Sequence, residues 1–142
     1  MASYEINVIR YGKSGWLIFN SGDVSVFTTC WWDPNVVIDE NSDGYVAYAT
    51  HMANKNDSVT HEKRPAIWLG KGVKYANGSR RSNGIFIHEG KNSGWSDGCI
   101  VAERAEVLKI WNAIVPKETD NVLVKVVDGL VGDFNRPAQW YV

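Results

Sequence analysis

Residues 84–115 read GIFIHEGKNSGWSDGCIVAERAEVLKIWNAIV, and the spacing of their apolar residues indicates the fold class. The apolar run at residues 85–88 has the length of a β-strand and ends at a histidine. After Cys99 the apolar period changes from two to about 3.6, which is typical of an amphipathic helix. The apolar stripe of this helix consists of Val107, Leu108, Trp111, Ile114 and Val115. We therefore predict a strand, a polar loop and then one helix that ends at Pro116.

The residues before this stretch predict further β-strands, because they are short β-branched and aromatic runs separated by turn residues. The expected strands are residues 6–10, 16–19, 24–32, 44–50, 66–69 and 85–88, with a last one at residues 122–127. The polar segments 52–64 and 70–83 are interpreted as exposed connections that could line a substrate groove. Many short strands and one late helix favour a mainly β domain.

The composition predicts one folded domain over residues 1–142. Hydrophobic residues make up 44% of the chain, and the aromatic residues are seven Trp, six Tyr and four Phe, which is enough to build a core. The 15 Lys and Arg nearly balance the 16 Asp and Glu, so neither nucleic acid nor an anionic membrane surface is an expected partner. No run approaches the ~20 apolar residues of a membrane span.

The start of the chain and its cysteines bear on location and redox chemistry. No basic segment followed by an apolar run opens the sequence, so we expect synthesis in the cytoplasm without a recognisable signal peptide. Cys30 and Cys99 are too few for a disulfide framework and form no CxxC pair for zinc. A bridge between them would block Cys99, and Cys30 is interpreted as a buried, inert thiol.

His88 and Cys99 are candidates for nucleophilic chemistry. A thiol attacks only as a thiolate, so it needs a base within reach, and histidine titrates near neutral pH. The glycine-rich loop between the two residues could fold Cys99 back against His88, and the backbone amides of residues 98–100 could form an oxyanion hole. The alternative is structural, because a lone cysteine is more often buried in a core and a histidine at a strand end is often only a hydrogen-bond donor.

His88 together with Ser96-Asp97-Gly98-Cys99-Ile100 resembles the active-site signature of the L,D-transpeptidase (YkuD-like) domain, in which a histidine precedes a Ser/Thr-His-Gly-Cys block and an apolar residue. The resemblance covers roughly residues 85–127. It departs from the common pattern in a shorter gap between histidine and cysteine, in Asp97 where a histidine is usual, and in Val101 where Arg or Asn is usual. The short gap is more similar to compact relatives among phage-encoded proteins and type VI secretion effectors that attack bacterial cell walls.

The resemblance implies a β-sandwich or curved mixed sheet with one main helix after the catalytic cysteine. It also implies acylation of a cysteine thiolate by the tetrapeptide stem of peptidoglycan, with no metal and no organic cofactor. Carried over, Cys99 would be the nucleophile, His88 its base, and Ser96 a support for the loop. Gly98 and Cys99 would supply oxyanion amides. Asp97 would oppose thiolate formation if it points inward, or would orient the site if it bonds the histidine or a loop amide.

Other side chains have a functional and a structural interpretation. Arg80 and Arg81 could clamp a substrate carboxylate, or form a solvated turn. Trp95 could line the site, and the pair Trp31-Trp32 could wall a groove or pack in the core. His51 and His61, with Asp57 and Glu62 nearby, match no metal-ligand spacing and are interpreted as an exposed polar loop.

The predicted function is therefore cysteine-dependent acyl transfer on peptidoglycan stem peptides, by an antibacterial effector or a phage-associated enzyme. Hydrolysis, transpeptidation and D-amino-acid exchange stay open. Such an enzyme is expected to act at the cell wall or in the periplasm after secretion, injection or lysis, and to meet an immunity protein or a secretion-apparatus component. The alternative is a non-catalytic module that binds peptidoglycan or a protein on the same scaffold. A papain-type peptidase is disfavoured because there the cysteine precedes the histidine.

Overall fold

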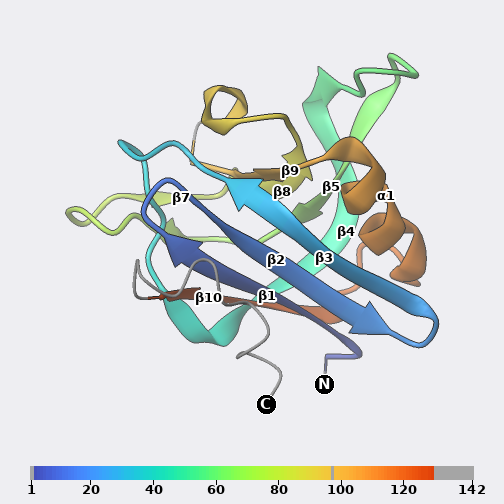
Figure 1. Ribbon diagram of the computed structural model, residues 1–142, viewed down its shortest axis with the longest axis horizontal. Coiled ribbons are helices and arrows are strands. Elements are labelled where there is room, and N and C mark those ends of the chain that lie inside the picture. The colour runs from blue at the N-terminus through green and yellow to red at the C-terminus, as the bar shows by residue number, and fades with distance from the viewer. Residues whose placement is uncertain (1, 97, 130–142) are drawn as a thin grey trace.

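The computed structural model describes residues 2–96 and 98–129. The structure is mainly β, with 52% of the described residues in strands and 10% in helix. Its elements in chain order are β1 Tyr4–Tyr11, β2 Ser14–Ser21, β3 Val24–Trp31, β4 Asn41–Asn56, β5 Lys63–Trp68, β6 Val73–Lys74, β7 Arg81–Ser82, β8 Phe86–Glu89, the 3-10 helix η1 Ser93–Trp95, β9 Ile100–Ala102, α1 Arg104–Ala113 and β10 Val122–Asp128 (Figure 1). Within these described ranges, neither helix is long and apolar enough to cross a membrane.

The main sheet closes into a barrel of eight strands in the order β1-β10-β4-β5-β8-β9-β3-β2, and β6 pairs with β7 separately. The barrel is mixed, because β1 runs parallel to β10 and β8 runs parallel to β9, whereas the other neighbours are antiparallel. Parallel neighbours need a crossover connection. For β8 and β9 this connection is the glycine-rich loop, which carries the chain from the end of β8 back to the start of β9.

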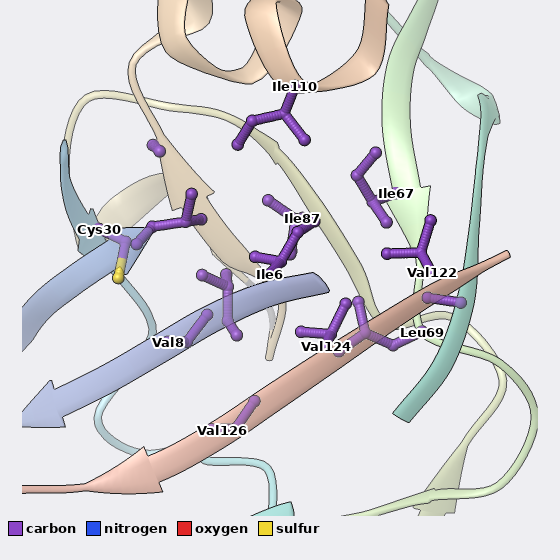
Figure 2. Packing of buried hydrophobic residues seen from close by; sticks show 14 of the residues in the cluster. Ile6, Val8, Cys30, Ile67, Leu69, Ile87, Ile110, Val122, Val124 and Val126 are labelled. Atoms are coloured by element: carbon purple, nitrogen blue, oxygen red, sulfur yellow. The ribbon is translucent and has the colours of Figure 1, made fainter. Parts of the chain in front are cut away.

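The core fills the barrel with alternating side chains of its strands. Figure 2 shows inward-facing residues such as Ile6 and Val8 of β1, Ile87 of β8 and Val124 of β10, all fully buried. The helix α1 packs against β3, β5 and β8 through a buried stripe of Val107, Ile110 and Ile114. These contacts fix β8, the strand that carries His88, and β8 in turn pairs with β9.

The mainly β class and the helix after Cys99 are confirmed, and the sheet is curved, mixed and closed. The opening strands β1, β2 and β3 form an antiparallel meander, and β10 lies where a last strand was predicted. The helix boundary was wrong, since α1 ends at Ala113 before Pro116 and the side chain of Val115 is 61% exposed. The helical stripe therefore ends at Ile114.

The prediction that residues 52–64 are exposed holds for most of them, but they do not form an irregular connection. β4 continues to Asn56 and β5 begins at Lys63, so most of this segment is a hairpin that extends beyond the barrel, in the upper right of Figure 1. Its strands carry polar residues on both faces, which removes the alternation that marks a half-buried strand. Residues 70–83 are likewise not a simple loop, because they contain β6, β7 and the buried side chain of Val73.

Candidate functional site

The register of β8 and β9 brings His88 and Cys99 to one face of the barrel. Ile87 pairs with Ile100 and both point into the core, so the residues next to them point outward. His88 pairs with Val101, and Cys99 lies two positions before Val101 on the same face. Such diagonal neighbours on adjacent strands lie roughly 7–8 Å apart between their backbones, within reach of long side chains. The glycine-rich loop therefore folds Cys99 back to the strand that carries His88.

His88 and Cys99 line the same cavity, which has a volume of about 440 Å³. This volume falls within the ~300–1,000 Å³ that is usual for small-molecule sites. The hairpin of β4 and β5 contributes one wall and the loop after β8 contributes another. The lining residues are Met52, Lys55, Arg64, Gly84, His88, Gly94, Trp95 and Cys99.

The Cys99 sulfur is held at the cavity by backbone groups. The amide of Phe86 donates to Sγ across 3.4 Å, and the thiol donates to the carbonyl oxygen of Gly84 across 3.6 Å. A donor aimed at the sulfur favours the thiolate, whereas the carbonyl favours the neutral thiol. Only 6% of Cys99 is exposed, so a reagent reaches the sulfur through the cavity.

Cys30 provides a contrast within the same chain. It is fully buried in the hydrophobic core, as Figure 2 shows, and this burial raises its pKa to about 12. Both cysteines are free thiols, so no bridge blocks Cys99. The two thiols therefore lie in different environments, one in the core and one in the cavity.

The His88 ring is oriented by its own strand. Nδ1 lies 2.7 Å from the backbone oxygen of Glu89, and only 3% of the residue is exposed. A carbonyl oxygen accepts, so Nδ1 of the neutral ring carries the proton, and Nε2 is the nitrogen with the basic lone pair. This tautomer suits a ring that takes a proton at Nε2.

The loop before Cys99 depends on Ser96 and Gly98. The Ser96 hydroxyl donates to the backbone oxygen of Cys99 and accepts from the Gly98 amide across 3.1 Å. The Gly98 amide is thus engaged inside the loop, in contrast to its expected role as an oxyanion donor. Gly98 has φ +105°, and a Cβ there would lie 3.3 Å from Tyr75 and from Val36. Asp97, which the sequence singled out, lies outside the described residues.

Buried carboxylates anchor the tip of the β4–β5 hairpin next to the cavity. Asp57 accepts from Nε of Arg104 across 2.9 Å and from the amides of Val59 and Thr60. The Arg104 hydrogen bond holds the pKa of Asp57 well below its usual range. Glu89, at the end of β8, accepts from the Ser58 hydroxyl and from the Ser58 amide. The hairpin is therefore attached to both β8 and α1.

Among residues 2–96 and 98–129, no group of three His, Cys, Asp or Glu side chains lies close enough to hold a metal ion. Comparisons with family models, with curated proteins and with solved structures give no match to this chain.

The other predicted site residues lie in different places. Trp95 lines the cavity and is 37% exposed. Trp32 is buried in the core cluster, whereas Trp31 is half-buried on β3. Within the described part of the chain, neither Arg80 nor Arg81 is among the residues that line the cavity: Arg80 lies over the Tyr75 ring, and Arg81 donates to the carbonyl of Gly72.

The sequence predicted that the segment 52–64 could line a groove, but it did not single out Met52, Lys55 and Arg64 as cavity residues. Their positions depend on the pairing of β4 with β5 beyond the barrel, and that pairing leaves no apolar alternation in the sequence. The ion pair of the buried Asp57 and the half-buried Arg104 joins residues 47 positions apart. No local pattern indicates a contact of that range.

Proposed function

We propose that this chain is a cysteine-dependent acyl-transfer enzyme of the L,D-transpeptidase or L,D-carboxypeptidase kind, acting on the tetrapeptide stems of peptidoglycan. The observation that carries the proposal is the shared cavity of His88, on β8, and Cys99, which directly precedes the neighbouring parallel strand β9. The signature around Cys99 supplies the substrate class. The β-rich barrel with one α-helix after Cys99 is compatible with an L,D-transpeptidase type of fold.

The reaction begins when Nε2 of His88 takes the proton of the Cys99 thiol. The thiolate attacks the carbonyl between the third and fourth stem residues, and the Phe86 amide stabilises the sulfur anion before attack. The peptide C–N bond then breaks, the imidazolium gives its proton to the leaving amine, and D-alanine departs. Water resolves the thioester to a tripeptide acid, whereas an amine acceptor gives a cross-link or an exchanged D-amino acid.

The biological role that we propose is attack on bacterial cell walls by an effector or a phage-associated enzyme. The short gap between His88 and Cys99 supports this role, since compact relatives of this kind have a similar gap. The cavity is built from side chains and backbone of the chain itself, and the proposed reaction needs no further group.

The test is the digestion of isolated sacculi by the wild-type protein and by Cys99→Ala, with mass spectrometry of the released muropeptides. Wild type should shorten or cross-link tetrapeptide stems, and Cys99→Ala should leave them unchanged. Cys30→Ala is the matched control, because it also removes one thiol but outside the cavity. Muropeptides that wild type leaves intact, or that Cys99→Ala changes equally, would contradict the proposal.

A non-catalytic binding module is the second candidate, and the contact between the Cys99 thiol and the Gly84 carbonyl favours it, because a carbonyl acceptor stabilises the neutral thiol over the thiolate. Thiol chemistry separates the two candidates. A catalytic Cys99 should react with iodoacetamide well below the ~8.5 pKa of a free cysteine. Cys30, with its pKa near 12, should react only in the unfolded protein and serves as an internal reference. Equal inertness of both thiols in the folded protein would favour the binding module.

A further inference from the structure

The cavity carries positive charge beside the thiol. Lys55 and Arg64 both line it, and among the described residues no acidic side chain does. Lys55 is exposed on β4, and Arg64 is half-buried at the start of β5. A cavity lined by one sign of charge concentrates the opposite charge in the ligand. The site is therefore suited to a substrate that carries an anion close to the bond under attack.

Arg64 is held through Nε, and its terminal nitrogens find no acceptor among the protein atoms that the structure describes. Its Nε donates to the backbone oxygen of Asn56 across 3.1 Å and lies 3.7 Å from Oε2 of Glu89. The guanidinium carbon lies 5.7 Å from the centre of the Trp95 ring. Within residues 2–96 and 98–129, Nη1 and Nη2 donate to no protein atom, and neither is sealed from solvent. The side chain is only 12% exposed, so these donors open toward the cavity.

We propose that Arg64, assisted by Lys55, binds a carboxylate of the acyl donor and so determines its specificity; this rests on the proposed function of Cys99. A guanidinium held by Nε presents a planar fork that matches a carboxylate bidentately. A stem tetrapeptide offers the carboxylate of its C-terminal residue, and also one on its third residue when that residue is diaminopimelate. Arg64 takes the role that the sequence suggested for Arg80 and Arg81.

The first test needs no peptide substrate. Iodoacetate and iodoacetamide both alkylate Cys99 by forming an S–C bond as iodide leaves, but only iodoacetate carries a carboxylate. We expect Arg64→Met to lower the ratio of their rate constants, iodoacetate over iodoacetamide, about tenfold relative to wild type. Arg64→Lys should lower it less, because the charge remains and the fork is lost. Lys71→Met, an exposed cation outside the cavity, is the matched control.

The second test uses stem tetrapeptides that differ in one carboxylate, with a free or amidated C-terminus and with diaminopimelate or lysine at the third position. Wild type should prefer one acid over its neutral counterpart by about 10- to 100-fold in kcat/KM, mostly through KM. That preference should disappear in Arg64→Met. The pair of peptides in which it disappears shows whether Arg64 binds the C-terminal carboxylate or the one on the third residue. Thermal melting of each variant shows whether the fold is retained.

The outcomes separate this inference from the proposed function. No turnover by wild type, or equal turnover by Cys99→Ala, overturns the proposed function. Turnover that depends on Cys99 but keeps its preference for the acid in Arg64→Met overturns the inference alone. The inference is also overturned if the ratio of iodoacetate to iodoacetamide rate constants is unchanged in Arg64→Met. It is overturned as well if that ratio falls in the double variant Arg80→Met/Arg81→Met but not in Arg64→Met.

Discussion

Replacing Gly98 by alanine tests whether the loop before Cys99 requires a glycine. At φ +105° an L residue is strained, at a cost of about 1–3 kcal/mol. The added Cβ would also lie 3.3 Å from Tyr75 and from Val36, and overpacking of this kind costs about 1–3 kcal/mol. Because one effect comes from the backbone and the other from packing, the two costs add, and we expect Gly98→Ala to lower the free energy of unfolding by about 2–6 kcal/mol.

Gly78→Ala is the matched control for this substitution. Gly78 has a similar positive φ of +89°, but no heavy atom lies within 4 Å of the position that its Cβ would take. It should therefore show the backbone cost alone, about 1–3 kcal/mol. Urea denaturation of both variants gives the two free energies, and their difference measures the packing around Gly98. Equal destabilisation by the two substitutions would refute the packing argument.

Gly98→Ala should also affect chemistry, because Gly98 directly precedes Cys99 and its amide donates to Ser96. A displacement of the nucleophile by about 1 Å can cost on the order of 10²-fold in rate. We expect turnover of stem tetrapeptides to fall by about that factor in Gly98→Ala and to remain at the wild-type level in Gly78→Ala, measured below the melting temperature of both. Normal turnover by folded Gly98→Ala would show that the loop conformation is not required for the reaction.

Three further substitutions test the base, the hairpin anchor and the core. His88→Gln should lower turnover of stem tetrapeptides by about 10²–10⁴-fold through loss of the base, and kinetics at saturating substrate check this. Asp57→Asn should cost about 2 kcal/mol at pH 7. Folding lowers the pKa of Asp57, so its contribution to stability is present above the usual carboxyl pKa range and is lost as the pH falls below that range. The stability of Asp57→Asn should therefore fall less steeply than that of wild type below about pH 5, and urea denaturation at several pH values measures this. Ile110→Ala, which empties a fully buried position between α1 and the barrel, should lower the free energy of unfolding by about 2–5 kcal/mol, and an unchanged urea midpoint would contradict the packing described for α1.

The strands of the barrel could be predicted from the sequence where one face of each strand is buried. The opening strands β1 to β3 and the last strand β10 have this pattern, and their predicted ranges lie within one or two residues of the observed ones. The strand β9 was missed, because its three residues are all apolar and all buried, and no turn separates them from the helix. A run of that length does not distinguish a strand from the beginning of a helix.

The arrangement of His88 and Cys99 could be anticipated in part. A histidine at the end of one strand and a cysteine eleven positions later place both residues near one connection, whatever the pairing. Their common face depends on the parallel pairing of β8 with β9 and on the register of Ile87 with Ile100. That register is a tertiary property, set by core packing around Ile87, and the sequence contains no local sign of it.

The role of Arg64 could not be predicted, because it depends on contacts between distant segments. Glu89 ends the strand that carries His88, and both of its carboxylate oxygens accept from Ser58, 31 positions away. With the carboxylate engaged in this way, Arg64 approaches it only through Nε, at 3.7 Å. The hairpin is thus fixed beside the thiol while the terminal nitrogens of Arg64 stay available to a ligand. A closer ion pair between Arg64 and Glu89 would have neutralised the cavity, so the hydrogen bonds of Ser58 are as necessary to the proposed carboxylate site as the arginine itself.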